Sequence, residues 1–141
     1  MLYRLNSPFY NHLYNNNPVK ASSQPCFVLF AAERSAPNNE RWCPDCTSAD
    51  PIIDEALQSA PAGATLLEVL ITKPEWKNDK NHFLRKPPLS VSGIPTLAVY
   101  DLAQQKISQR FVEGECEQLE ALQAVFMGSN FDSHQDKPTH L

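Results

Sequence analysis

Two short apolar runs, separated by a segment of helical periodicity, constrain the fold of this chain more than any other feature. The runs are residues 26–32 (CFVLFAA) and 64–71 (ATLLEVLI), and their length and composition predict two buried strands. The segment between them carries an apolar stripe at spacings of three and four, formed by Ile52, Ile53, Ala56, Leu57 and Ala60. We therefore predict a helix from Cys43 to Ala60, kinked at Pro51, that joins a parallel pair of strands as a crossover.

The second half of the chain predicts a mixed sheet. Two further strands are expected there, joined by a turn so short that the pair must be antiparallel. The remaining expected elements are strands 96–100 and 106–112, helices 79–86 and 115–127, and loops 33–41 and 72–78. Asp79 is the expected N-cap of its helix. The chain is thus predicted to be α/β, with a mixed central β-sheet flanked by helices.

Composition and charge indicate one domain without a nucleic-acid or membrane surface. The 141 residues carry a net charge of −4, which lacks the basic excess that such surfaces need. No apolar run reaches the ~18 residues of a transmembrane helix, and the first residues do not form a secretory signal. We expect a cytoplasmic protein with a domain at residues 26–127, a polar segment at 1–25 and a disordered polar tail at 128–141.

The segment WCPDC, residues 42–46, carries the predicted chemistry, because it lies where the predicted helix begins. The unpaired N–H groups and the dipole of a helix N-terminus stabilise a thiolate, so Cys43 is the predicted nucleophile. Cys46 lies one turn further along the same side, is expected to be less exposed, and is the predicted resolving thiol. Pro44 stiffens the first turn, whereas the carboxylate of Asp45 opposes thiolate formation and disfavours acidic substrates.

The cysteine pair has two alternative roles, as half of a zinc site or as a structural disulfide. Zinc requires four ligands, and the sequence offers no second close pair, only Cys26, Cys116 and four scattered histidines. A disulfide between such near neighbours closes too short a loop to restrict the unfolded chain much. We therefore predict no metal site. Cys26 is expected to be a buried apolar residue, and Cys116 either another such residue or a regulatory thiol.

Ile94, Pro95 and Thr96 directly precede an apolar strand. If the bond before Pro95 is cis, the backbone groups preceding it face the reactive sulfur, and an extended substrate can pair with them as an added strand does. Alternatively, Pro95 simply begins the strand. We favour the first interpretation and predict that these three residues contact the substrate.

The chain resembles the thioredoxin domain-containing protein 17 family, within the thioredoxin-like superfamily, on four segments in order: residues 27–32, 42–46, 73–78 (KPEWKN) and 94–96. The resemblance covers residues 26–127 and includes the long loop before the WCPDC motif. It implies a thioredoxin-like fold and a reductase of small-molecule and protein disulfides that holds no cofactor itself. It further implies that NADPH supplies the electrons through thioredoxin reductase, the expected partner. We expect the chain to act as a monomer.

The chain departs from thioredoxins at one position. Thioredoxins carry a buried Asp in the strand before the motif, and Leu29 stands near that place here. Proton transfer to Cys46 then needs water or another acid, for which Asp45 and Glu33 are candidates. The missing Asp also suggests an alternative function, a thioredoxin-fold binding or signalling module without turnover.

Two tryptophans are the remaining candidate site residues. Trp42 precedes the predicted nucleophile, where it can contact the substrate or pack against the domain. Trp76 either lines the substrate groove or anchors the loop that carries it. Lys77 and Lys80, next to Trp76, are expected to be ordinary surface charges.

Overall fold

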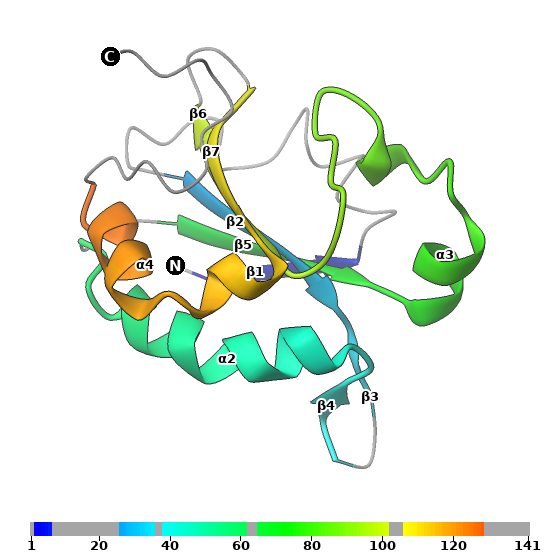
Figure 1. Cartoon of the computed structure of the whole chain (residues 1–141), viewed down its shortest axis with the longest axis horizontal. Helices are drawn as coiled ribbons and strands as arrows, with labels where there is room; N and C mark the ends of the chain where they lie inside the picture. Colours follow the sequence, from blue (N-terminus) through cyan, green and yellow to red (C-terminus); the bar gives the residue numbers. More distant parts are fainter. Residues whose placement is uncertain (1, 7–25, 36–37, 62–64, 102–105, 129–141) are drawn as a thin grey trace.

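A five-stranded mixed sheet forms the centre of the molecule, which the computed structural model describes at residues 2–6, 26–35, 38–61, 65–101 and 106–128 (Figure 1). The strand order is β1-β5-β2-β6-β7, with bounds Leu2–Asn6, Thr65–Ile71, Cys26–Ala32, Thr96–Asp101 and Lys106–Val112. β5 runs parallel to both β1 and β2, whereas β6 is antiparallel to β2 and β7. The predicted α/β class and mixed sheet are confirmed.

β1 is a strand that sequence analysis did not predict. It pairs with β5 in a register that runs from Leu2 opposite Leu66 to Asn6 opposite Leu70. The stretch LYRLN is short and alternates only weakly, so it gave no strand pattern. The segment 1–25 therefore contributes one strand to the central sheet, and the rest of that segment lies outside the described residues.

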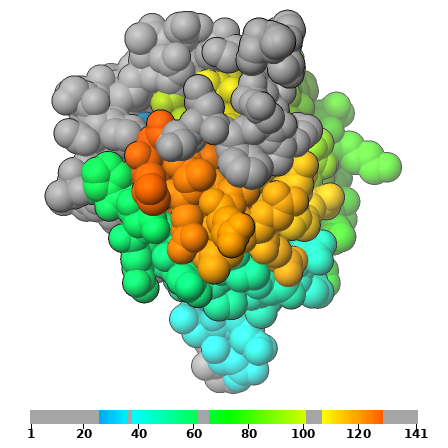
Figure 2. All heavy atoms as spheres, turned by 60° about the vertical axis from the view of Figure 1, so that its left-hand side comes forward, coloured from blue at the N-terminus to red at the C-terminus, as the bar shows by residue number. Residues whose placement is uncertain are grey.

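Helix α2 (Pro44–Leu57), the 3₁₀ helix η3 (Glu113–Glu117) and helix α4 (Leu119–Phe126) pack together beside the sheet (Figure 1, Figure 2). Helix α3 (Lys73–Asn78) and the 3₁₀ helix η2 (Phe83–Arg85) lie at the end of the sheet where β5 terminates (Figure 1). Helices thus flank the sheet, and α2 and α3 approach each other at one end of it.

α2 forms as predicted and places the WCPDC segment at its N-terminus. Cys43 is the N-cap, with extended backbone angles of φ −104° and ψ 118°. The helix continues through Pro51 and ends at Leu57, before the predicted end at Ala60. Ala60 precedes Pro61, and a residue before proline avoids the helical conformation, which accounts for the earlier end.

Residues 72–78 form α3 in place of the predicted loop. The Glu75 N–H donates to the hydroxyl oxygen of Thr72 at 3.3 Å, and the Thr72 N–H donates to the carboxylate of Glu75 at 2.7 Å. This reciprocal pair is a capping box, and Pro74 is well suited to a first helical turn. The Thr-x-x-Glu spacing is the sequence signal of this helix, and the prediction of a loop at residues 72–78 overlooked it.

The predicted helix at residues 79–86 is wrong. Asp79 ends α3 as its C-cap, and its carboxylate accepts the N–H of Asn81 at 2.9 Å. Within 79–86, all of which the structure describes, helical geometry is confined to η2. His82, with φ −53° and ψ 138°, leaves the helical conformation in the middle of this segment, and its ring accepts the N–H of Leu84 at 3.2 Å.

The predicted loop at residues 33–41 contains a small hairpin. Strands β3 (Arg34–Ser35) and β4 (Glu40–Arg41) pair antiparallel, and the hairpin projects from the body of the molecule (Figure 2). It returns the chain to the sheet directly before Trp42, so that Arg41 turns inward and is buried. The hairpin therefore places a buried arginine directly before the WCPDC motif.

The predicted helix at residues 115–127 is divided at Gln118. That residue has φ −92° and ψ 86°, outside the helical region, and separates η3 from α4. Cys116 consequently lies in η3 and does not open the last helix. The predicted disordered tail, from residue 129 onward, lies outside the described residues.

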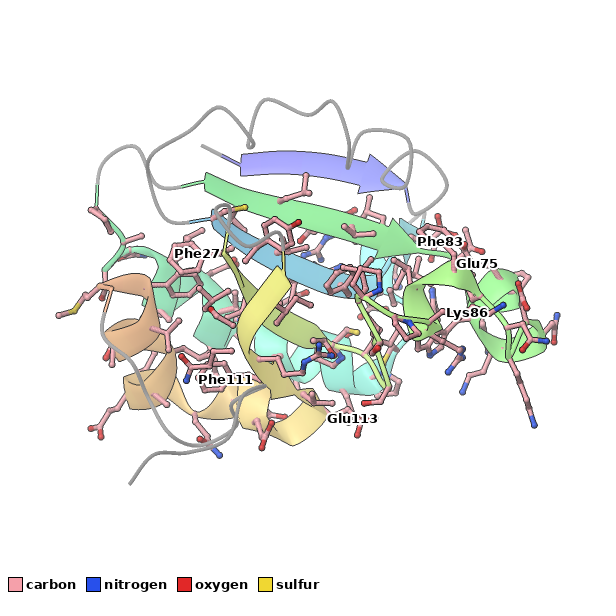
Figure 3. The ribbon with its side chains drawn as sticks, turned by 90° about the horizontal axis from the view of Figure 1, so that it is seen from above. Phe27, Glu75, Phe83, Lys86, Phe111 and Glu113 are labelled. Atoms are coloured by element: carbon pink, nitrogen blue, oxygen red, sulfur yellow. The ribbon has the colours of Figure 1, made fainter. Side chains whose placement is uncertain are left out.

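β2 is buried along its whole length, as its continuous apolar run predicts. Phe27 of this strand meets Phe126 of α4 edge-on, with ring centroids 4.7 Å apart. Phe111 of β7 is fully buried near α4, and together these rings fill the space between sheet and helices (Figure 3). This packing fixes α2 and α4 against the sheet, and with them the start of α2.

Candidate functional site

Cys43 is half-buried at the N-terminus of α2. Its carbonyl accepts the N–H of Thr47 at 3.1 Å, which closes the first helical turn, and its thiol donates to the carbonyl of Ile94 at 3.8 Å. All four cysteines are free thiols. A partly exposed sulfur at the positive end of a helix is placed as a nucleophile requires.

Cys46 lies one turn further into α2 and is 1% exposed. Its sulfur accepts the backbone N–H of Ala32 at 3.5 Å. Burial raises the pKa of the Cys46 thiol well above its usual value, and the neighbouring Cys43 raises it further, while the Ala32 N–H and the charge of Arg41 lower it. The predicted asymmetry between an accessible Cys43 and a protected Cys46 is confirmed.

An open groove of about 500 Å³ lies beside Cys43. It runs between the start of α2, helix α3 and the segment before β6. Six predicted site residues line it: Trp42, Cys43, Pro44, Asp45, Trp76 and Ile94. The structure thus brings together residues from three segments that lie far apart in the sequence.

The two tryptophans both pack against the domain and line the groove. The indole N–H of Trp42 donates to the carbonyl of Ile71 at 2.8 Å, which ties the ring to the end of β5. Trp76 is 7% exposed, and the guanidinium of Arg85 stacks over it at 3.5 Å from the ring centroid. Arg85 also donates to the carbonyl of Trp76 at 2.6 Å, so α3 is held in place by its own groove-lining residue.

The Ile94–Pro95 peptide bond is cis, as predicted. Ile94 lines the groove, but Pro95 and Thr96 are buried behind it and are not among the lining residues. The Pro95 carbonyl accepts the N–H of Glu113 at 2.7 Å, and the Thr96 hydroxyl donates to the carbonyl of Gly93 at 2.6 Å. Of the three predicted substrate contacts, the geometry therefore supports Ile94, while Pro95 and Thr96 hold the groove wall.

Five lining residues were not predicted: Lys73, Lys77, Ser92, Gly93 and Glu113. Lys77 was expected to be an ordinary surface charge, and recognition of the capping box would have placed it on a helix beside Trp76. Glu113 has φ +53°, and a Cβ added to Gly93 would lie only 2.8 Å from its carboxylate. The close approach of the Glu113 side chain to Gly93 joins residues far apart in the chain, so no local sequence pattern predicts it. The groove carries charges of both signs.

The proton-transfer candidates named from the sequence are not among the groups that shift the pKa of Cys46. Leu29 is 2% exposed and lies opposite Glu68 of β5 in the sheet register. Asp45 is exposed and Glu33 is half-buried. The groups that change the pKa of Cys46 are instead its burial, Ala32, Cys43 and Arg41.

Within the described ranges, no three His, Cys, Asp or Glu side chains gather in an arrangement that could hold a metal ion. His12, His134 and His140 lie outside those ranges. Among the helices of the described chain, none combines the length and apolar character that a bilayer crossing demands.

Comparison with known proteins places the chain in a family. Residues 9–128 match the family described as Thioredoxin domain-containing protein 17-like, thioredoxin domain. Human Thioredoxin domain-containing protein 17 is 32% identical over 101 residues, which is 71% of this chain and 76% of that protein. The zebrafish (Danio rerio) protein of the same name is 30% identical over the same shares, and the rice (Oryza sativa) Thioredoxin-like protein Clot is 35% identical over 75 residues, 50% of this chain and 54% of its own length. The chain therefore belongs to the thioredoxin domain-containing protein 17-like family and has the thioredoxin fold.

Proposed function

We propose that this protein is a disulfide reductase whose Cys43 and Cys46 thiols carry the electrons. One observation supports it above the others: a partly exposed Cys43 lies at a helix N-terminus in an open groove, with the buried Cys46 one turn behind it. Membership of a thioredoxin family agrees with such chemistry.

The proposed reaction has two thiol–disulfide exchanges. The Cys43 thiolate attacks one sulfur of the substrate disulfide, forms a mixed disulfide with it, and releases the other sulfur as a thiolate that takes a proton from water. Cys46 then loses its proton and attacks the Cys43 sulfur. The Cys43–Cys46 disulfide forms, the bond to the substrate breaks, and the second substrate thiolate leaves. Two electrons pass from the protein to the substrate.

The groove favours small or flexible disulfides. It is open to solvent, and two tryptophans, Trp42 and Trp76, line it near the nucleophile. Lys73 and Lys77 on one wall, with Asp45 and Glu113 on the others, can pair with a substrate that carries charges of both signs. These features support a small-molecule disulfide or an exposed disulfide of a protein as substrate.

Recycling needs an external reductant, because each turnover leaves Cys43 and Cys46 oxidised. We propose that an NADPH-dependent thioredoxin reductase supplies these electrons, so that no cofactor binds the chain itself. Such a cycle suits the cytoplasm, where thiols are kept reduced. The protein acts in it as a monomer.

Turnover with purified components tests the proposal. Wild-type protein, NADPH, thioredoxin reductase and either insulin or cystine should consume NADPH, Cys43→Ser should abolish the activity, and Cys46→Ser should accumulate a mixed disulfide. Cys26→Ala, a matched cysteine substitution away from the groove, should retain activity. Undiminished turnover in Cys43→Ser would refute the proposal. Partner binding that survives loss of both active-site thiols, without turnover, would support a binding module instead.

A further inference from the structure

Cys46 must lose its proton during the second proposed exchange, yet so little of its surface reaches water that hydration stabilises the charge only weakly. It is 1% exposed, and burial raises the pKa of its thiol. One donor is in place, the backbone N–H of Ala32 at 3.5 Å from the sulfur. A hydrogen bond to a thiolate replaces part of the lost hydration, so whatever holds Ala32 affects this step.

Arg41 is the charged residue behind Ala32. It belongs to β4, its side chain is 1% exposed, and its Nη1 donates to the carbonyl of Ala32 at 2.6 Å. Its Nε donates to both carboxylate oxygens of Asp50, at 2.9 and 3.0 Å, and its Nη2 donates to Glu68 at 2.8 Å. Ala32 therefore donates its N–H to the Cys46 sulfur while its carbonyl binds a buried guanidinium.

The charge of Arg41 is fixed in place. Burial lowers the pKa of its guanidinium, but the hydrogen bonds to Asp50 and Glu68 outweigh this and leave the pKa above its ordinary value. Arg34 also binds Asp50, at 3.0 Å, from a more exposed position. Among the side chains that the structure describes, two arginines thus face two carboxylates.

We propose that Arg41 is a positioning residue for the resolving step: it holds the Ala32 N–H on the Cys46 sulfur, and its charge stabilises the thiolate that attacks the mixed disulfide. This inference rests on the proposed reductase function. The Cys46 proton goes to water, the Cys46 sulfur bonds to the Cys43 sulfur, and the electron pair of the broken bond leaves on the substrate sulfur. Arg41 transfers no proton, because a guanidinium stays protonated.

Other charged groups near this part of α2 do not have the same effect. Besides Cys43, Arg41 and Asp50, the elements packed here carry these titratable or charged side chains: Asp45, Asp54 and Glu55 on α2, Glu40 on β4, Glu68 on β5, Glu113, Glu115, Cys116 and Glu117 on η3, and Glu120 on α4. Cys43 disfavours a second negative charge, and Glu113 acts on Cys116. Among the described residues, Arg41 is the charged side chain that favours the Cys46 thiolate.

Four variants separate the charge of Arg41 from its packing. Arg41→Gln removes the charge, and Arg41→Lys keeps it without the forked geometry. Arg34→Gln is the matched control, because Arg34 binds the same Asp50 from outside. The double variant Arg41→Gln, Glu68→Gln removes both charges of the buried Arg41–Glu68 ion pair, which costs the fold less than removing one member of such a pair.

The assay follows one turnover with dithiobis(nitrobenzoate), whose thiolate product is coloured. The first equivalent released reports the attack by Cys43, and the second reports resolution by Cys46. Each unit by which the pKa of Cys46 rises lowers its thiolate fraction tenfold. A less acidic thiol also gives a more nucleophilic thiolate, so the rate of the second phase falls only about threefold per unit. In Arg41→Gln the first phase should change by less than about twofold, while the second slows about threefold or more and its pH profile moves to higher pH.

Arg41→Lys should recover most of the second-phase rate, and Arg34→Gln should match the wild type in both phases. The double variant should show the same slow second phase as Arg41→Gln. The role of Arg41 would be overturned if folded Arg41→Gln, or the double variant, showed a second phase with the rate and pH profile of the wild type. A wild type that releases only the first equivalent would instead contradict the reductase function, so the two failures are distinguishable.

Discussion

The buried thiol of Cys26 should make the protein lose stability at alkaline pH. Cys26 is 2% exposed in β2, and burial raises the pKa of its thiol from 9.0 to about 12. Above pH 9 the unfolded chain releases this proton while the folded chain keeps it. The stabilisation is therefore complete below pH 9 and is lost as pH rises towards 12.

The size of the effect follows from the shift. Each pH unit in this window lowers the free energy of unfolding by about 1.4 kcal/mol for one such thiol, or about 4 kcal/mol across the window. Burial likewise raises the pKa of Cys116 to about 12, which gives a second contribution of the same sign. Buried Cys46, whose pKa is also raised, contributes with the same sign, and since domains are stable by only about 5–15 kcal/mol, these thiols together should remove a large part of the stability at alkaline pH.

The pH dependence of stability is measured by urea unfolding of wild type and Cys26→Ala under reducing conditions at several pH values. The variant should be less stable at neutral pH because the sulfur leaves a small cavity, but its stability should fall less steeply above pH 9, by about 1.4 kcal/mol per unit. Val28→Ala, a buried control on the same strand, should lower stability equally at every pH. Parallel curves for wild type and Cys26→Ala would refute the reasoning.

Three further predictions concern the groove. Thr72→Ala removes the cap of α3 and should lower the free energy of unfolding by about 1 kcal/mol in urea titration, whereas Thr72→Ser should retain it; equal losses would contradict the capping role. Asp45→Asn should speed the reaction of Cys43 with the anionic reagent dithiobis(nitrobenzoate) about two- to fivefold at low salt, because the carboxylate no longer repels the reagent, and a slower reaction would disprove this. Lys77→Gln should slow reduction of an anionic disulfide about two- to threefold at low salt, while Lys80→Gln, at an exposed position outside the groove, should not. Equal slowing in the two variants would contradict binding of the substrate beside Lys77.

Local patterns in the sequence were sufficient for most of the sheet and for the cysteine pair. β2 and β5 are continuous apolar runs because they are buried in the sheet, and the stripe of α2 reflects the face that packs on it. Predicting where that helix begins was enough to predict the positions of Cys43 and Cys46. These features depend on residues close together in the chain, so the sequence pattern carries them.

The features that escaped prediction depend on competing local signals or on distant contacts. Residues 72–78 were predicted as a loop although the side chains of Thr72 and Glu75 cap a helix there. Arg41 would ordinarily be exposed, and its burial is explained by its bonds to Asp50, to the Ala32 carbonyl and to Glu68, which lies 27 residues away. Such a buried ion pair has no periodicity in the sequence, which is why the charge behind Cys46 emerges only from the folded structure.

Mapping the disulfide formed when the reduced protein meets a limiting amount of substrate disulfide is the simplest decisive experiment. Peptide mass spectrometry should find one internal bond, between Cys43 and Cys46, with Cys26 and Cys116 still thiols that react with an alkylating agent only after unfolding. A bond that includes Cys26 or Cys116, or two active-site thiols that remain reduced while the substrate persists, would contradict the dithiol mechanism.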